Sequence, residues 1–531
     1  MEFLAAALAL SCIGQSSPTI QINPLLLVEA QEIWSIIGRR DNPVWPGWDA
    51  RNTPILIYFP GRQDLLVNHP KPPAGFTRYR GPITSPIGQI YIKYGKTIID
   101  LDGQNTSTDV NGIRTLVVAD TLSTRRQWVE SLAAAITSEP ARADKIVEAS
   151  LFPDPYSSMT TFAHEAFHVY QEKLAPNKGA NELALVKYPS LSVENNVGFA
   201  LESDFLAAAL LAKSETDVRR EAVNWLAVRL ARRAAIGKEA SDYEDGNEFS
   251  EGTAHYVEYR TLQALESRSP AREMWLMQGF RGYRDLSSER AALIRQMQRT
   301  MDGSQIVNND LYGASPVRFR LYSSGMAIGA LLDRLHFKWQ DRILKTDASL
   351  TDLAGEAIHA STAELDTALS AIRQAKRYVS LVAEKTALAN AGKTYIAHEL
   401  DDFEHAPAEL VVDYSGLKDP KVNLVFTPFG ILRIDDERTM FRLIPIRGSI
   451  GKASFSEDAA RPVLRDHGAR TLRVELTGPL DKAAIAQQLR VPALDGASFE
   501  ANELRLPGAT LLRIRGRVTL DGRRIIVQLR E

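Results

Sequence analysis

Cysteine is almost absent from this chain: Cys12 is the only one among 531 residues. A single cysteine excludes an intrachain disulfide. Long apolar runs are absent too, since none reaches the roughly 18 to 20 residues that a helix needs to cross a bilayer. Neither sign of charge is in excess, because the formal net charge is −2. A chain with this balance has no general electrostatic attraction for nucleic acid, and we expect no nucleic-acid partner.

The first apolar run, FLAAALALSCIG, has the length of a signal-peptide core and is followed by small polar residues, GQSSP. Glu2 stands where such a core usually has Lys or Arg. We interpret residues 1–17 as a leader that directs export to the periplasm or the exterior. Two alternatives stay open. LSC loosely resembles a lipobox, so Cys12 is a candidate for lipid attachment and a membrane tether, or the segment is a retained N-terminal helix.

The length of the chain suggests two to four domains. The residue pattern changes twice along it. Residues 18–122 hold a helix pattern, LLLVEAQEIWSIIG, and strand patterns such as ILIYFP and IRTLVVAD. Helical segments dominate residues 123–395, and strand patterns dominate residues 405–531. Asp521-Gly522 between two of these predicts a hairpin. We therefore predict an α+β fold with a small sheet and dominant helices, followed by a β-rich C-terminal module of accessory role that is a candidate for binding a partner.

The stretch TTFAHEAFHVYQEKL, which begins at residue 160, carries the pattern that bears most directly on function. Its apolar spacing predicts a helix, with a cap at one of the serines 157–158. On this helix His164 and His168 lie one turn apart and point the same way, as two imidazoles must to bind one zinc ion. Glu165 is placed to act as general base on a zinc-bound water. The alternative is an ordinary helix with two structural histidines.

A zinc site of this kind needs a third protein ligand, most simply a glutamate from a later helix. Glu194 lies in a segment that reads as a turn, and Glu202 lies in a strong helix pattern. We favour Glu251, because the neighbouring Gly252 allows two helices to approach closely. Glu202 is the second choice, or else it orients a ligand histidine. His255, one turn beyond Glu251, is a candidate to support a metal ligand from outside, a candidate substrate donor, or a packed histidine. An acidic cluster surrounds the favoured ligand: Glu244, Asp245, Glu248, Glu251 and Glu258.

The pairing of HEAFH with the later SEGTAHYVE resembles the gluzincin group of zinc metallopeptidases. Residues 50–340 also look like poorly characterised exported bacterial members, through PILIYF, LLVNHPKPP and RLYSSGMAIGALLDRL. The resemblance implies a zincin-like catalytic region with His164, His168 and Glu251 as zinc ligands and Glu165 as general base. It also implies a donor that stabilises the oxyanion of the tetrahedral intermediate. Tyr322 is our candidate for that role, with Tyr312 and His255 behind it.

Two departures from the family pattern narrow the expected activity. The spacing from His168 to Glu251 is far longer than in compact members, so a helical insert must lie between them. A G-x-M-E-N stretch, which holds the substrate amine in the aminopeptidase branch, is missing ahead of the motif. The strand IRTLVVAD could be a sheet edge that aligns an extended peptide by β-addition, which would favour endopeptidase cleavage.

The sequence thus predicts an exported or envelope-anchored zinc metallopeptidase acting on a peptide or protein. One alternative is a zinc-binding envelope protein without proteolytic activity, whose β module binds a partner. Another keeps the zinc hydrolase and changes the substrate to a peptidoglycan cross-link.

Overall fold

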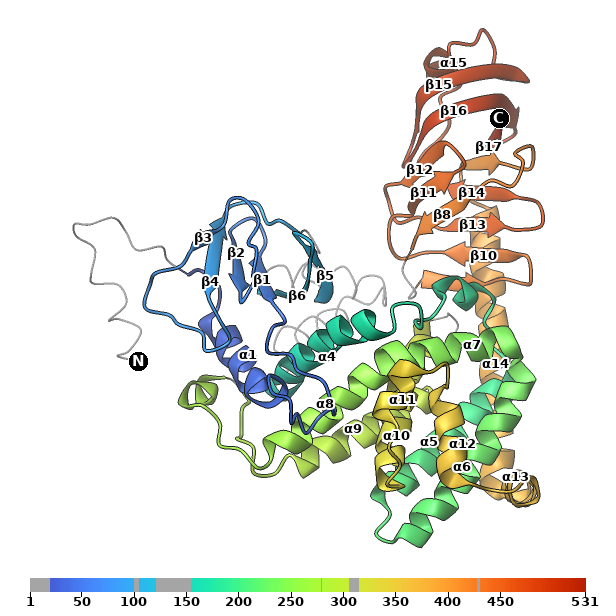
Figure 1. The fold of residues 1–531 in the computed structure, drawn as a ribbon. Coiled ribbons are helices and arrows are strands. Elements are labelled where there is room, and N and C mark those ends of the chain that lie inside the picture. The colour runs from blue at the N-terminus through green and yellow to red at the C-terminus, as the bar shows by residue number, and fades with distance from the viewer. Residues whose placement is uncertain (1–19, 100–104, 121–153, 278, 305–314, 427–429) are drawn as a thin grey trace. The chain divides into compact units, whose positions relative to one another are not determined.

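The structure is a computed structural model, and it describes residues 20–99, 105–120, 154–277, 279–304, 315–426 and 430–531. The expected leader, with Cys12, and Tyr312 lie outside the described residues. The prediction of an α+β fold is confirmed (Figure 1). No described helix is long and apolar enough to span a membrane.

By its internal packing the chain divides into two compact units. The first comprises the described residues within 1–134, 138–177 and 254–291, and the second comprises those within 178–253 and 292–531. One boundary falls inside a continuous helical run, just after Thr253.

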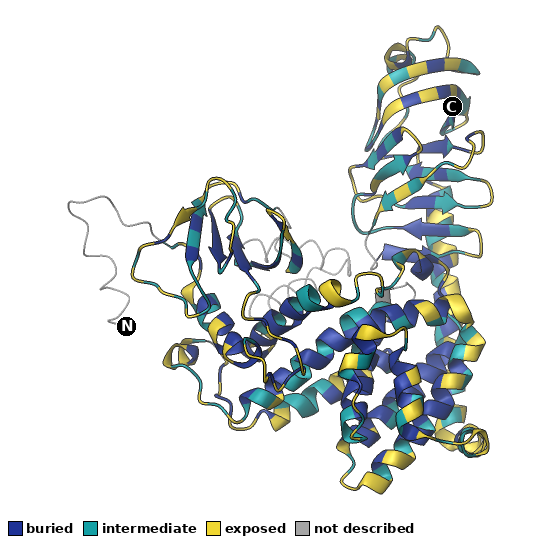
Figure 2. Ribbon diagram, in the orientation of Figure 1, coloured by how far each residue is buried: buried dark blue, intermediate teal, exposed yellow. Residues whose placement is uncertain are grey.

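The first unit contains a six-stranded sheet with the order β3-β4-β2-β1-β6-β5. Only the β1–β6 pair is parallel. Its strands are β1 (Ile55–Phe59), β2 (Gln63–Val67), β3 (Thr77–Arg78), β4 (Ile90–Tyr94), β5 (Thr106–Val110) and β6 (Ile113–Ala119). The central strands β1 and β2 are almost wholly buried (Figure 2). One face of the sheet is packed around Leu56, Tyr58 and Val117.

The helices of the first unit pack near this sheet and against one another. They are α1 (Pro24–Ile37), α4 (Pro155–Leu174), α8 (Thr253–Leu265) and the short 3-10 turn η3 (Arg272–Leu276), with the start of α9 (Ser287–Asp302). Helix α4 contacts α1 and the strands β5 and β6. The helix that carries the two histidines is therefore held directly against the sheet.

The second unit contains most of the helices. They are η1 (Glu182–Lys187), α5 (Val193–Leu211), α6 (Glu215–Ile236), α7 (Lys238–Asn247), η2 (Glu248–Gly252), α10 (Ser315–Arg334), α11 (Gln340–Lys345), α12 (Leu350–Ile358), α13 (Thr362–Gln374) and α14 (Lys376–Glu404). The helical insert expected between His168 and Glu251 is formed mainly by α5 and α6, which pack along each other.

The β-rich C-terminal module forms one sheet of eleven strands. Its strands are β7 (Glu409–Asp413), β8 (Val422–Val425), β9 (Ile431–Arg433), β10 (Arg438–Phe441), β11 (Arg447–Ile450), β12 (Ala453–Glu457), β13 (Val463–Asp466), β14 (Thr471–Glu475), β15 (Ala497–Leu506), β16 (Ala509–Asp521) and β17 (Arg524–Leu529), with helix α15 (Lys482–Leu489) before β15. The hairpin expected at Asp521-Gly522 is confirmed, because Asp521 pairs with Arg524. The end of α14 packs on this sheet through Phe403 and Leu432.

Candidate metal centre

Helix α4 begins at an Asp-Pro pair. The side chain of Asp154 accepts hydrogen bonds from the backbone N–H groups of Tyr156 and Ser157, and Pro155 occupies the first turn, where a missing N–H has no cost. The cap expected at residues 157–158 is therefore wrong by about one turn. The apolar face of the helix is buried as its spacing predicts, through Met159, Phe162, Ala163, Ala166 and Phe167. This burial fixes which way the two histidines point.

His164 and His168 direct the same ring nitrogen at one point. Their Nε2 atoms lie 3.0 Å apart, and the ring centroids are 4.7 Å apart with the ring planes nearly perpendicular. His164 is buried and His168 is half-buried. Two tetrahedral zinc ligands at about 2.0 to 2.1 Å from the ion lie slightly more than 3 Å from each other. The pair thus needs little rearrangement to grip one ion.

The other ring nitrogens are already occupied by acceptors. Nδ1 of His164 lies 2.6 Å from a carboxylate oxygen of Glu258, and Nδ1 of His168 lies 2.9 Å from the side-chain oxygen of Gln171. Because these oxygens accept and do not donate, each Nδ1 carries the hydrogen. Both Nε2 atoms then present lone pairs to each other at 3.0 Å, which repel unless a metal ion or a proton lies between them.

Two groups of described residues can hold a metal ion. One is His164, His168 and Glu251, and the other is His164, His255 and Glu258, whose ligand atoms lie within 4.8 Å of one another. Nitrogen and carboxylate oxygen form a donor set that suits zinc. The first group is the ligand set expected from the sequence.

Glu258 and His255 fit an outer role better than direct ligation. Glu258 contacts Nδ1 of His164 at 2.6 Å, the nitrogen turned away from His168, and its second oxygen lies 3.8 Å from Nδ1 of His255. A carboxylate in that place fixes the ring orientation of a ligand histidine and raises its basicity. Sequence reasoning assigned this role to Glu202 and missed Glu258. The available signal was spacing, since Glu251, His255 and Glu258 are four and three residues apart and share one helix face.

Glu251 lies in an irregular turn of helix. Residues Glu248–Gly252 form a single π-turn, η2, that leads directly into α8. Such turns are frequent at functional sites, because they shift the register of the side chains that follow. Gly252 is required here: a Cβ at this position would lie 2.6 Å from the Cα of Gly325 on α10. The close approach expected at Gly252 thus involves α10.

This glycine contact places two side chains of α10 against Glu251. Arg318 donates to Glu251 at 3.1 Å through Nη2, to the hydroxyl of Tyr322 at 2.8 Å through Nε, and to Glu182 through Nη1. Tyr322 also interacts with Glu251 through its hydroxyl. Burial and the charge of Glu251 raise the pKa of Tyr322 well above its ordinary value, so the phenol stays protonated. The candidate oxyanion donor therefore lies beside the candidate third ligand.

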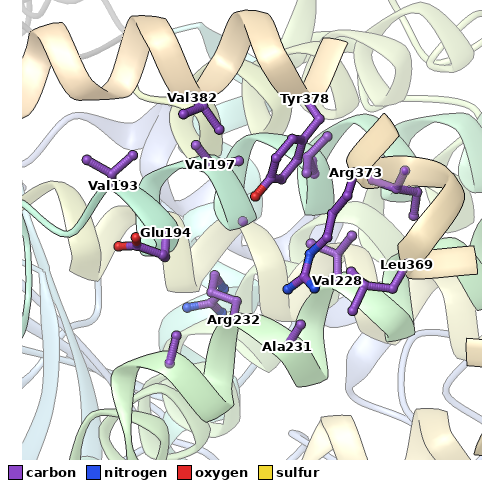
Figure 3. A pocket seen from close by; sticks show the side chains of 14 residues that line it. Val193, Glu194, Val197, Val228, Ala231, Arg232, Leu369, Arg373, Tyr378 and Val382 are labelled. Atoms are coloured by element: carbon purple, nitrogen blue, oxygen red, sulfur yellow. The ribbon is translucent and has the colours of Figure 1, made fainter. Parts of the chain in front are cut away.

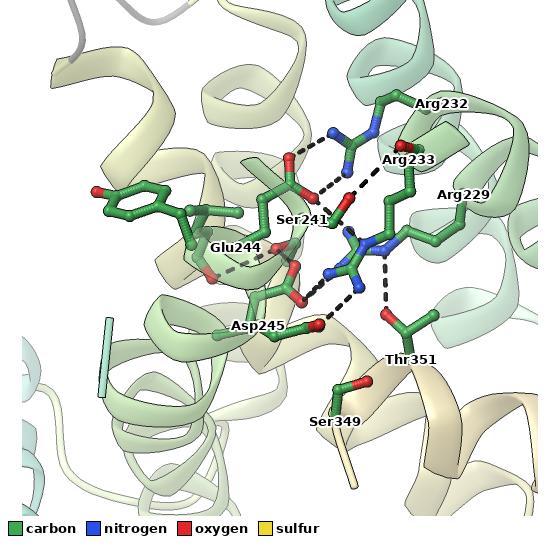
Figure 4. Close-up of polar contacts among 12 residues, drawn as sticks. Arg229, Arg232, Arg233, Ser241, Glu244, Asp245, Ser349 and Thr351 are labelled. Carbon is green, nitrogen blue, oxygen red and sulfur yellow. Dashed lines mark hydrogen bonds and ion pairs between the residues drawn. The ribbon is translucent and has the colours of Figure 1, made fainter. Parts of the chain in front are cut away.

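The two competing glutamates have other surroundings. Glu202 is fully buried and accepts from Arg229 at 2.9 Å and from Arg232 at 2.5 Å (Figure 4 shows these arginines). A carboxylate neutralised by two guanidinium groups is a poor metal ligand. Glu194, expected in a turn, is exposed in the first turn of α5. Neither belongs to a described group that can hold a metal.

Glu165 is half-buried on α4, immediately after His164.

The sequence predicted that IRTLVVAD forms an edge of the sheet, and this prediction is wrong. The segment forms β6, which lies between β1 and β5. The polar residues of β5 pair with β6 across a two-residue turn, Asn111-Gly112, with both φ angles positive. Strand β5, which contacts α4, is therefore the edge on this side of the sheet.

Comparison with models of known protein families, with curated protein sequences and with solved structures finds no match to this chain.

Proposed function

We propose that this protein is a zinc-dependent metallopeptidase with His164, His168 and Glu251 as metal ligands. The observation that carries the proposal is the pair of Nε2 atoms 3.0 Å apart, each on a ring whose Nδ1 is held by an acceptor. Two merely structural histidines in this arrangement need a shared proton and one charged ring, whereas a metal ion between the two Nε2 atoms makes the arrangement favourable with both rings neutral.

The side chains around the histidine pair fit a catalytic zinc site. Two histidines and a glutamate are three protein ligands, which leaves a fourth position for water or substrate. Glu258 and Gln171 supply the outer hydrogen bonds that such ligands need. When bound, zinc would lower the pKa of water and polarise the carbonyl of a scissile peptide bond.

The protein's own groups would then handle the proton and the developing charge. Glu165 accepts the proton of the attacking water and later delivers it to the leaving amine. Tyr322, kept protonated beside Glu251, donates a hydrogen bond to the oxyanion. Arg318 holds the carboxylate of Glu251 and the hydroxyl of Tyr322 in place.

The substrate in this proposal is an extended peptide. The peptide would pair with strand β5, because β5 is the edge strand of the sheet and contacts α4. Export, and a lipid tether through Cys12, remain predictions from the sequence. The β-rich C-terminal module is proposed as an accessory region that binds a partner.

The first test is elemental analysis of zinc per chain in wild type, Glu251→Ala and Glu194→Ala. About one zinc in wild type and in Glu194→Ala, with loss in Glu251→Ala, supports the ligand set. Wild type without zinc, even after zinc is added back, would overturn the proposal.

A second test separates catalysis from simple zinc binding. Glu165→Gln should retain the metal and lose about 10²- to 10⁴-fold in cleavage of casein or a quenched peptide library. Cleavage of a muropeptide digest in place of casein would move the substrate to peptidoglycan. Retained zinc without turnover on any of these substrates in wild type would favour the non-proteolytic alternative.

A further inference from the structure

A cavity of about 170 Å³ lies in the second unit, between α5, α6, α13 and α14. It involves none of the candidate metal ligands. Aliphatic side chains make up most of its lining residues, among them Val197, Leu201, Val228, Leu369, Ile372 and Val382. Five of these residues also belong to, or pack against, one apolar cluster of α5, α6, α13 and α14, so the wall is fixed by the helix packing.

Two polar groups face the cavity from the last turn of α13 and the first turn of α14. Figure 3 shows the hydroxyl of Tyr378 directed into it and the side chain of Arg373 extending along it. No hydrogen bond or ion pair is found for either group among the described residues. Arg373 also lies in the last turn of α13, where a cation favourably meets the helix dipole. Arg373 is exposed, so its guanidinium lies at the rim of the cavity and is accessible to a ligand from solvent.

The remaining charges at the cavity determine where an anion would sit. Arg232 lines the inner side, but its guanidinium is engaged by Glu202 and Glu244. Glu194 lies on the far side of the cavity from Arg373 (Figure 3), and its carboxylate accepts from the hydroxyl of Ser192. A negative group is therefore attracted to the Arg373 side and repelled from the Glu194 side.

We propose that this cavity binds a small carboxylate with a compact aliphatic body. Arg373 would meet the carboxylate with its planar fork, and the hydroxyl of Tyr378 would donate a further hydrogen bond to it. The aliphatic body would fill the space between the four helices. A cavity of 150 Å³ in another protein accommodates benzene, so a body of about five or six carbons fits here. The ligand is either a free acid or the C-terminal residue of an apolar peptide, because both present the same chemistry.

The test uses the full-length protein and isothermal titration with 4-methylpentanoate. The matched neutral compound is 4-methylpentanamide, and acetate serves as the carboxylate without an aliphatic body. We expect saturable binding of 4-methylpentanoate, with both other compounds at least about tenfold weaker. In Arg373→Gln the preference for the acid over the amide should vanish, and Tyr378→Phe should weaken the acid about threefold to tenfold. Lys376→Gln, which removes a nearby charge that does not line the cavity, should leave binding unchanged.

Two results would overturn the proposal. One is the absence of saturable binding of 4-methylpentanoate up to about 10 mM. The other is binding that Arg373→Gln leaves unaltered. A further arm compares N-acetyl-alanyl-leucine: tighter binding than 4-methylpentanoate identifies a peptide C-terminus as the source of the carboxylate, and weaker binding identifies a free acid. The proposal does not depend on metal binding, so it stands or falls separately from the peptidase function.

Discussion

The carboxylates on one helical run, α7–η2–α8, form two groups that differ in burial and in the residues they contact. Glu244 and Glu248 are fully buried and face guanidinium groups of α6, Glu244 meeting Arg232 and Glu248 meeting Arg229 (Figure 4 shows the arginines and Glu244). Glu251 and Glu258, further along the same run, remain partly accessible, and Glu258 meets a histidine ring. The residue type is the same and the sequence neighbourhood is shared. The partner element decides whether a glutamate supports the fold or is available for chemistry.

The electrostatics follow from these partners. Burial alone would raise the pKa of Glu244, but the charges of Arg232, Arg233 and Arg229 outweigh it and lower the pKa to about 2. On α1, Glu29 is buried beside the hydroxyl of Ser158, and burial raises its pKa to about 7. Two buried glutamates thus differ by several pKa units because one has cations beside it and the other has a hydroxyl.

Removing a cation from the buried network should have the largest effect. Arg229→Met leaves Glu202 and Glu248 buried with a lost partner, and we expect a loss of about 3 to 5 kcal/mol in unfolding free energy. Urea denaturation followed by circular dichroism measures it. Arg219→Met on the same helix is the control, because Arg219 forms an exposed pair with Glu364 and should change stability little. Equal effects of the two substitutions would contradict the structural role assigned to Arg229.

Glu29 predicts a pH dependence of the opposite sign from that of Glu244. Its pKa is about 7 when folded and near 4.5 when unfolded, so between these values the folded state binds more protons. Stability therefore falls as pH rises from about 4.5 to about 7, by up to about 3 kcal/mol from this group. Glu29→Gln should remove that slope, as measured by unfolding midpoints at pH 5 to 8. A slope that is unchanged in the variant would show that Glu29 ionises normally.

Local sequence patterns predicted the helix of the motif and much of the sheet. The apolar spacing around His164 predicted the buried face of α4, and Asp521-Gly522 predicted the β16–β17 hairpin. These features depend on residues close in sequence. Strand β5 was missed because its residues are polar, although Asn111-Gly112 was a hairpin signal.

The environment of the glutamates could not be predicted in the same way. Which helix faces Gly252 depends on α10, more than 60 residues further along the chain. The pairing of Glu202 with Arg229 depends on how α5 and α6 pack, which no periodicity of a single helix reveals. The neighbouring Gly252 and the SEGTAHYVE resemblance favoured Glu251 as a ligand, but only the packed structure shows Glu258 against His164 and Arg318 against Glu251.

Glu258→Gln tests whether the glutamate that contacts His164 supports metal binding. An amide cannot accept from Nδ1 of His164 with the strength of a carboxylate, so metal affinity should fall about 10- to 100-fold. Competition with a chelator measures this, independently of peptidase activity. Glu266→Gln, which removes a carboxylate paired with Arg290 just beyond α8, is the control and should bind metal like wild type. Unchanged affinity in Glu258→Gln would leave Glu258 with a packing role.

Arg318→Lys is the mildest change and separates charge from geometry. A lysine keeps the positive charge near Glu251 but cannot contact Glu251, Tyr322 and Glu182 together, since only the planar fork of arginine reaches all three. We expect metal affinity about threefold to tenfold weaker, from a less well oriented Glu251, with the unfolding midpoint nearly unchanged. Arg334→Lys, on the same helix but bound to backbone carbonyls of Leu210 and Ala212, should leave the metal affinity as it is. If both variants bind metal like wild type, charge alone suffices at position 318, and the difference between the two sets of glutamates lies in burial and not in how their partners orient them.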